Sequence, residues 1–221
     1  MFIHVNGVRL YYEKSGNGEP LLLLHGNEED HRIFDEAVEV LKKHYTVYAI
    51  DSRGHGQSDK VKEYHYLDMA KDIKEMIEQL NLKDVSLMGS SDGAIIGLHL
   101  GSLYPHLVKH LILAGVNVKP QGVIEEVYED MKKQYQKTKN PLIKMMLEEP
   151  HISNKELHQI EAKTLLLAGS EDLIKLDHIE RIAHHIKNCT FKILDGEDHS
   201  SYIIHNKKIA HIILDELKNP R

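Results

Sequence analysis

The sequence contains a single cysteine, Cys189, so it cannot form an internal disulfide. Disulfides persist mainly in oxidising compartments, and this composition therefore favours a reducing, cytoplasmic location. The first residues lack the basic start and the long apolar region of a signal peptide, and none is predicted. Cys189 precedes an expected strand, and we interpret it as structural and not as a nucleophile.

Long apolar runs and an excess of positive charge are also lacking. No segment reaches the roughly 20 apolar residues of a membrane span. The net charge of −6 argues against a general nucleic-acid binder, which is usually basic. We therefore expect neither a membrane nor a nucleic-acid partner. The hydrophobic content of 41% is enough for a substantial core in a chain of 221 residues.

Histidine, in contrast, is abundant, with 17 residues. His106 and His110 are four residues apart, but they straddle an expected helix end and strand start and so do not share one helical face. No cysteine or acidic residue completes a ligand set. We predict no metal and no cofactor, and we interpret most of these histidines as solvated surface residues.

Apolar runs alternate with amphipathic stretches along most of the chain. The dipeptide Asn6-Gly7 between two apolar segments predicts an opening antiparallel hairpin. The alternation beyond it predicts βαβ units, and therefore an α/β fold with a mostly parallel central sheet and helices on both faces. Strands are expected at 21–24, 45–50, 85–88, 111–114, 164–168 and 191–194, and helices at 33–43, 67–80, after Ser91, at 176–187 and at 202–217, the last ending at Asn219-Pro220.

The alternation of predicted strands and helices stops in residues 117–157. The segment predicts two or three short helices, at 123–137, 141–149 and 153–160, with no strand between them. We interpret it as a small helical lid, inserted into a core made of residues 1–116 and 158–221. An ordinary long crossover between two strands is the alternative.

Residues 85–93 carry the strongest functional signal. An apolar run ends in Gly89-Ser90-Ser91-Asp92-Gly93, and a helical stretch follows at once. This is the G-x-S-x-G pattern at a sharp strand-to-helix turn, which holds its central serine in a strained conformation at the tip of a strand. Side chains two residues before and after would collide with neighbouring backbone, which explains the two glycines. The pattern predicts that Ser91 is a nucleophile.

A serine nucleophile needs a base, and the base needs an orienting carboxylate. In open α/β sheets both are expected after the carboxyl ends of later strands. His199 follows the strand at 191–194, and Asp172 follows the strand at 164–168, with Glu171 and Asp177 as rivals. The edge at Gly115 to Asn117 offers no carboxylate. The alternatives are a surface histidine and an aspartate that only caps the next helix.

The reaction also needs hydrogen-bond donors for an oxyanion. The turn at His25-Gly26-Asn27 lies at the right edge of the sheet, and we propose the backbone N–H groups of Asn27 and Asp92. Their side chains are expected to matter less than their amides. The glycine-rich loop at 51–58 lacks the phosphate-binding patterns, and we interpret it as structural, with internal hydrogen bonds of Arg53 and Asp51.

Four features of the sequence resemble the α/β-hydrolase superfamily. They are the order nucleophile–acid–histidine, the sharp strand-to-helix turn at 89–93 (the elbow), His25-Gly26 and the loop at 51–58. The resemblance covers essentially the whole chain except residues 117–157, where that family has its variable lid. It implies the α/β-hydrolase fold, a triad of Ser91, Asp172 and His199, and an oxyanion hole at Asn27 and Asp92. Serine at position 91 differs from the aspartate of haloalkane dehalogenases and epoxide hydrolases.

The prediction is a serine hydrolase acting on a small carboxylic ester or thioester through an acyl-enzyme on Ser91. The same triad would also serve a C–C bond hydrolase, a lyase, an aminopeptidase or a haloperoxidase-like enzyme. A different class is a ligand receptor or signalling protein on a hydrolase scaffold. A small-molecule substrate is the one partner predicted, and the sequence makes no prediction of oligomeric state.

Overall fold

The computed structural model describes residues 1–218, which form the α/β architecture that the alternation predicts. Eight strands make one sheet in the order β1-β2-β4-β3-β5-β6-β7-β8. The first two pairings are antiparallel, and all pairings from β4 to β8 are parallel. The predicted stop of the last helix at Asn219-Pro220 lies outside the described residues.

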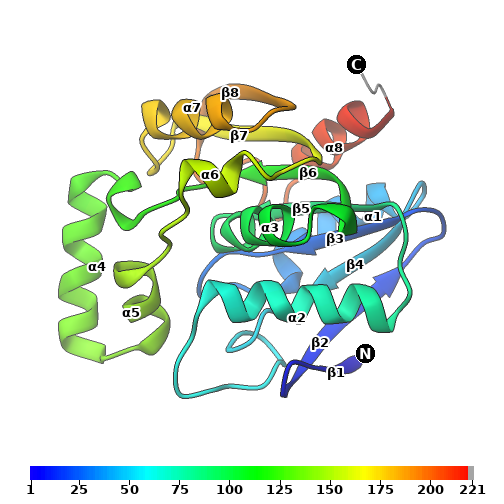
Figure 1. Ribbon diagram of the computed structural model, residues 1–221, viewed down its shortest axis with the longest axis horizontal. Coiled ribbons are helices and arrows are strands. Elements are labelled where there is room, and N and C mark those ends of the chain that lie inside the picture. Colours follow the sequence, from blue (N-terminus) through cyan, green and yellow to red (C-terminus); the bar gives the residue numbers. More distant parts are fainter. Residues whose placement is uncertain (219–221) are drawn as a thin grey trace.

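The elements follow the predicted order along the chain (Figure 1). The strands are β1 (Phe2–Val5), β2 (Val8–Ser15), β3 (Pro20–Leu24), β4 (Thr46–Ile50), β5 (Val85–Ser90), β6 (Val108–Ala114), β7 (Lys163–Glu171) and β8 (Cys189–Asp198). The α-helices are α1 (Asp35–Leu41), α2 (Tyr66–Gln79), α3 (Asp92–Leu103), α4 (Glu125–Thr138), α5 (Pro141–Glu148), α6 (Asn154–Leu157), α7 (Leu176–His185) and α8 (Lys208–Lys218). Three short 3-10 helices are η1 (His31–Phe34), η2 (Pro105–Leu107) and η3 (Pro120–Gly122).

The hairpin at the N-terminus confirms the turn prediction. Val5 pairs with Val8, and the two residues between them have φ angles of 44° at Asn6 and 77° at Gly7. Both angles lie in the left-handed region, which a two-residue hairpin turn of this kind requires. Asparagine and glycine tolerate that region best, so the local sequence fixes the turn.

The sheet separates two hydrophobic clusters, one on each face. Successive side chains of a strand point to opposite faces. Leu22 and Leu24 therefore belong to the cluster that includes residues of α2, α3 and α7, whereas Leu21 and Leu23 belong to the cluster that includes residues of α1 and α8. Figure 1 shows α2 and α3 in front of the strands and α1 behind them. A fully apolar strand such as β3 is therefore the expected result of burial on both faces.

Helix α3 lies especially close to the sheet. A Cβ atom on Gly97 would be 2.7 Å from Leu113 Cδ2 and 3.1 Å from Leu87 Cδ2. A larger residue there would require the Leu113 side chain to shift. The small residue at position 97 thus allows α3 to pack closely against the sheet.

The last helix begins later than the periodicity predicts. It starts at Lys208, and the preceding residues form turns in which His205 has a φ angle of 47°. The His205 N–H donates to the Ile33 carbonyl at 2.8 Å. A left-handed residue cannot continue an α-helix, so the expectation that His205 lies inside the helix is wrong.

Between β6 and β7 the chain forms the helices α4, α5 and α6. In residues 117–157 the structure has no strand, only an isolated bridge between Val123 and Ile174. Figure 1 shows α4 and α5 beyond one end of the sheet, apart from the helices that cover its faces. The three helices agree with the two or three that the sequence predicts for this segment. The domain boundaries and the role of the segment as a lid stay predictions.

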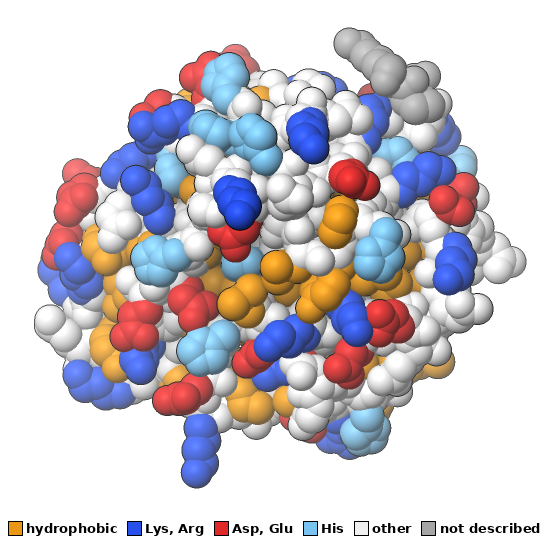
Figure 2. Space-filling model, viewed as in Figure 1, with side chains coloured by type: hydrophobic (Ala, Val, Ile, Leu, Met, Phe, Trp, Pro, Cys, Tyr) orange, Lys and Arg blue, Asp and Glu red, His pale blue; other side chains and the backbone are white. Residues whose placement is uncertain are grey.

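The surface is mixed in charge on the face that carries α2, α3 and α6. Figure 2 shows acidic and basic side chains interspersed there, with a band of hydrophobic side chains across the middle. Within residues 1–218, no helix has the length and apolar character needed to cross a membrane.

The loop at 51–58 is held differently from the prediction. Asp51 does make an internal bond, because its Oδ2 accepts the Gln57 N–H at 2.8 Å. Arg53, however, reaches out of the loop, and its Nε donates to Asp72 Oδ2 on α2 at 2.7 Å. Both side chains are buried, so the guanidinium needs a charged partner, and the loop itself offers none that is free.

The Arg53–Asp72 pair generates a stability prediction. We expect Arg53→Met to lower the free energy of unfolding by about 3–5 kcal/mol, because it leaves the buried Asp72 carboxylate with Asn6 alone. The matched control is Lys71→Met, which removes an exposed ion pair with Asp68 and should cost less than about 1 kcal/mol. Urea unfolding measures both. An equal loss of unfolding free energy in the two variants would contradict the stabilising role of the Arg53–Asp72 pair.

Candidate active site

Ser91 lies between β5 and α3 in a strained backbone conformation. Its φ angle is 51° and its ψ angle is −114°, which is rare for a residue other than glycine. The Ser91 N–H donates to the Ala114 carbonyl on β6 at 2.9 Å, and its carbonyl accepts the Ala94 N–H. The turn is thus pinned on both sides, and Ser91 stays partly exposed at the edge of the sheet.

The two glycines of the elbow are required by close backbone contacts. A Cβ atom on Gly89 would be 2.3 Å from the Gly93 carbonyl oxygen, and one on Gly93 would be 2.2 Å from the Leu24 carbonyl oxygen. Neither distance is possible for a real side chain. This confirms the steric argument made from the sequence.

His199 and Asp172 lie together. The His199 Nδ1–H donates to Asp172 Oδ1 at 2.7 Å, and Asp172 also accepts the N–H groups of Ile174 and Gly169. The Asp172 side chain is completely buried, whereas that of His199 is 17% exposed. Because Nδ1 donates to the carboxylate, Nε2 of the neutral imidazole is left as an acceptor. The rival Glu171 is exposed, and Asp177 pairs with Arg181.

Gly115 contacts the imidazole ring of His199. A Cβ atom on Gly115 would be 2.4 Å from His199 Cε1, so the imidazole packs directly against this glycine. Gly115 directly follows Ala114, whose carbonyl holds the Ser91 N–H. Within residues 1–218 no hydrogen bond joins Ser91 Oγ to His199, and such bonds are often long until a substrate is bound.

The residues predicted for the site lie along one edge of the sheet. Parallel strands end on the same side, and β3, β5, β6, β7 and β8 are neighbours in that order. Their ends carry, in the same spatial order, Asn27, Ser91, Gly115, Asp172 and His199.

Two backbone N–H groups remain available at this edge. Among residues 1–218, the amides of Asn27 and Asp92 have no hydrogen-bond acceptor. The Asn27 side chain is engaged, however: its Nδ2 donates to Met146 Sδ on α5, and its Oδ1 lies 3.2 Å from His55 Nε2. The side chain therefore has structural partners, although the expectation that the amides matter more stays a prediction.

His25 holds the loop that carries Asn27. Its Nδ1 lies 2.6 Å from the Gly26 carbonyl, and its Nε2 lies 3.1 Å from the Ser52 N. A carbonyl can only accept and an N–H can only donate, so His25 is neutral with its proton on Nδ1. Burial agrees with this, because it lowers the pKa of His25 to about 4.

The Asp92 carboxyl is buried under the elbow. Its Oδ1 accepts the Tyr66 hydroxyl at 2.7 Å, and its Oδ2 has no partner among residues 1–218. Burial raises the pKa of Asp92 to about 7. The carboxyl is therefore partly protonated near neutral pH.

A further carboxyl, that of Glu29, enters the site from the loop after β3. Its Oε2 accepts the Gly26 N–H at 2.7 Å. A Cβ atom on Gly26 would be 2.9 Å from this oxygen and 3.1 Å from Ser91 Cβ, so both lie beside the same point. Burial raises the pKa of Glu29, while the Gly26 N–H and the charge of His199 act against that rise.

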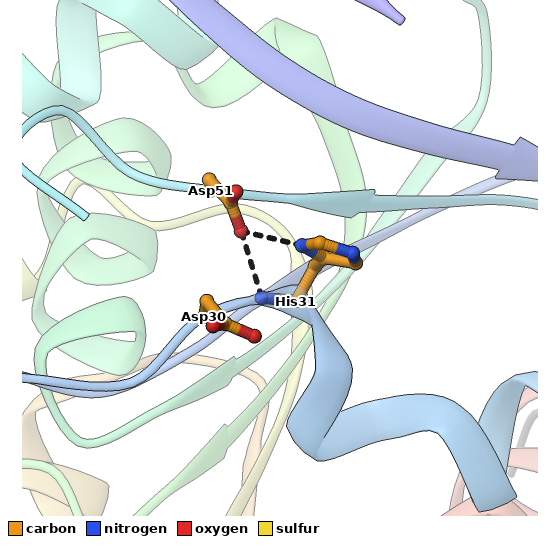
Figure 3. Close-up of side chains that lie close together, drawn as sticks. All are labelled: Asp30, His31 and Asp51. Atoms are coloured by element: carbon orange, nitrogen blue, oxygen red, sulfur yellow. Dashed lines mark hydrogen bonds and ion pairs between the residues drawn. The ribbon is translucent and has the colours of Figure 1, made fainter. Parts of the chain in front are cut away.

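Another polar cluster joins Asp30, His31 and Asp51, whose ligand atoms lie within 4.8 Å of one another (Figure 3). Asp51 Oδ1 accepts one hydrogen bond from the backbone N–H of His31 and one from Nδ1 of the His31 ring. Asp30 pairs with Arg32. These groups already satisfy one another, so we interpret the cluster as a link between η1 and β4 and assign no metal to it. It borders a cavity of 590 Å³ that does not include Ser91.

Sequence reasoning missed three residues of this site. Gly115 and Tyr66 act through contacts between distant segments, and no local pattern marks them. Glu29 had a signal, because Glu28-Glu29-Asp30 is an unusual acidic run directly after the expected oxyanion turn.

Comparison with known proteins supports the fold and its family. The family model described as the alpha/beta hydrolase fold matches residues 19–145. A curated relative is the mouse serine hydrolase BPHL (Mus musculus), 26% identical over 98% of this chain and 85% of its own length. The 2-hydroxy-6-oxo-6-(2'-aminophenyl)hexa-2,4-dienoic acid hydrolase of Metapseudomonas resinovorans is 30% identical over 59% of this chain and 46% of its own.

A solved structure has the same fold over almost the whole length. The esterase EaEST from Exiguobacterium antarcticum superposes with a TM-score of 0.86 at 22% sequence identity, covering 99% of each chain. At that identity the likeness shows the fold alone.

The neutral state of His25 generates a pH prediction. Its pKa falls from 6.5 to about 4 on folding, so the unfolded chain binds the proton more tightly. Stability should therefore drop by about 3 kcal/mol as the pH falls from 6.5 to about 4. The side chain in the variant His25→Gln cannot titrate. Between pH 6.5 and about 4, its free energy of unfolding, measured with urea, should therefore fall by about 3 kcal/mol less than that of the wild type. Parallel curves for both proteins would contradict the prediction.

Proposed function

Because this chain belongs to the alpha/beta hydrolase fold family, we propose that it is a serine hydrolase that cleaves a small carboxylic ester or thioester through an acyl-enzyme on Ser91. The observation that carries the proposal is the Asp172–His199 pair, joined at 2.7 Å and packed against Gly115, the residue after the Ala114 whose carbonyl accepts the N–H of the strained Ser91. A histidine that is oriented by a buried carboxylate and keeps Nε2 free is what a serine nucleophile requires.

In the proposed reaction, His199 Nε2 takes the proton of the Ser91 hydroxyl as the oxygen attacks the acyl carbonyl. Asp172 keeps the imidazole in the right tautomer and stabilises the imidazolium that forms. The imidazolium then gives its proton to the leaving alcohol or thiol. Water, activated by His199 in the same way, attacks the acyl-enzyme and releases the acid together with free Ser91.

The negative charge of the tetrahedral intermediate needs preorganised donors. Asp92 directly follows Ser91, and Asn27 follows Gly26, whose Cβ position would lie 3.1 Å from Ser91 Cβ. We assign the oxyanion to the unoccupied N–H groups of these two residues. Each such donor contributes roughly 10²–10³-fold to the rate. Asp92 is also the first residue of α3, so the positive end of the helix dipole supports the same charge.

We assign the helices α4 to α6 to the substrate side of the site. Helix α5 reaches the oxyanion loop through Met146, which contacts Asn27, and the Asn140 side chain before α5 donates to Glu28. Substrate contacts from this segment would decide the acyl or alcohol group that is accepted. This is the lid role that the sequence analysis expects.

A second candidate reaction follows from one relative. The similarity to the 2-hydroxy-6-oxo-6-(2'-aminophenyl)hexa-2,4-dienoic acid hydrolase favours hydrolysis of a related acid with the same three residues. Turnover of such an acid in preference to simple esters would decide for this candidate.

The role of Ser91 has a direct test. We expect wild-type protein to hydrolyse p-nitrophenyl acetate or butyrate and to form a covalent adduct with a fluorophosphonate on Ser91. Ser91→Ala should lower kcat by roughly 10⁴–10⁶-fold and abolish labelling, because it removes the nucleophile. The control is Ser90→Ala, which alters the neighbouring buried serine and should keep labelling. Equal ester turnover by wild type and Ser91→Ala would overturn the proposed function.

The contact between Gly115 and His199 predicts a second effect. Gly115→Ala places a methyl group where the imidazole lies, so His199 must move, and a displacement of about 1 Å can cost about 10²-fold in kcat. The control is Gly7→Ala, which also puts alanine at a positive φ but far from the site and with open space around it. Unchanged ester kinetics in a folded Gly115→Ala protein would exclude the assigned role of this contact.

A further inference from the structure

The Glu29 carboxylate lies inside the candidate active site, yet the proposed reaction makes no use of it. Its Oε2 is held by the Gly26 N–H, one residue before the proposed oxyanion donor Asn27. The same oxygen and Ser91 Cβ lie 2.9 Å and 3.1 Å from the point where a Cβ of Gly26 would sit. A substrate carbonyl bound at Ser91 therefore has this carboxylate as a close neighbour.

The charges around Glu29 do not cancel its own. Among residues 1–218 no lysine or arginine forms an ion pair with it. The titratable groups that face it are His199, Asp92 and Asp30, and Asp30 is itself paired with Arg32. Before substrate binds, the neighbourhood of Ser91 thus carries carboxyl groups without a permanent cation.

We propose that Glu29 is a specificity-determining residue that makes the site reject substrates with an anionic group near the scissile carbonyl and favour neutral or cationic ones. The inference rests on the proposed serine-hydrolase function. Its physical basis is the repulsion between like charges in a partly buried site, where the effective dielectric constant is far below that of water. The same charge works against the second candidate reaction, whose substrate is an acid.

The test compares ester pairs of similar size and different charge. Dimethyl succinate and monomethyl succinate differ by one negative charge, and methyl butyrate and β-alanine methyl ester differ by one positive charge. For the wild type we expect kcat/KM, measured by methanol release at neutral pH and low salt, to be at least about tenfold lower for monomethyl than for dimethyl succinate. High salt should narrow this ratio, because Glu29 is only partly buried.

The variant Glu29→Gln keeps the size and the acceptor for the Gly26 N–H but removes the charge. The ratio of kcat/KM for dimethyl succinate to that for monomethyl succinate should fall about tenfold in this variant. The preference for β-alanine methyl ester over methyl butyrate should fall by a similar factor. Each ratio compares two substrates of the same variant, so a general change in the activity of Glu29→Gln cancels from it. Glu28→Gln is the matched control, because Glu28 is the exposed neighbour, and it should leave both ratios unchanged.

The outcomes separate the two proposals. Turnover that depends on Ser91, with both charge ratios unchanged by Glu29→Gln, overturns the inference and leaves the proposed function standing. A similar change in both ratios by Glu28→Gln also overturns it, since the effect would then be a general property of the acidic run. Failure of the wild type to hydrolyse all four esters and to label on Ser91 overturns the proposed function and this inference with it.

Discussion

The close backbone contact at the elbow is the constraint on which the rest of the structure depends. Gly93 touches the Leu24 carbonyl of β3 and Gly89 touches the Gly93 carbonyl, so α3 can start only where no side chain intervenes. This contact sets the φ of 51° at Ser91 and places its N–H on β6. The strain is stored in one residue and is held by packing on both faces of the sheet.

The other parts of the site are arranged around that fixed point by the order of the strands. The nucleophile, the histidine and its carboxylate come from distant parts of the sequence and meet because β5 to β8 are consecutive in the sheet. Two carboxyl groups near the nucleophile differ in burial. Asp92 is buried enough to be partly neutral, whereas Glu29 is only partly buried. Charge near the nucleophile is thus controlled by how deeply each carboxyl is buried.

Much of the fold could be predicted because its signals are local. Apolar runs mark the buried strands, Asn6-Gly7 marks the hairpin, and a glycine on each side marks the strained serine. Predictions failed where a distant segment decides the conformation. Arg53 pairs with Asp72 on α2 and not within its own loop, and His205 leaves the helical pattern at the contact with Ile33. No window of the sequence contains both partners of these contacts.

By itself the sequence determined the α/β fold class and singled out Ser91, His199 and Asp172, because each follows the end of a strand that the sequence predicts. Only the tertiary structure decided how they meet. It shows that Asp172 and not Glu171 reaches the histidine, that Gly115 gives the imidazole its place, and that Glu29 enters the site. Distances between residues far apart in the chain depend on sheet order and packing, which local periodicity does not encode.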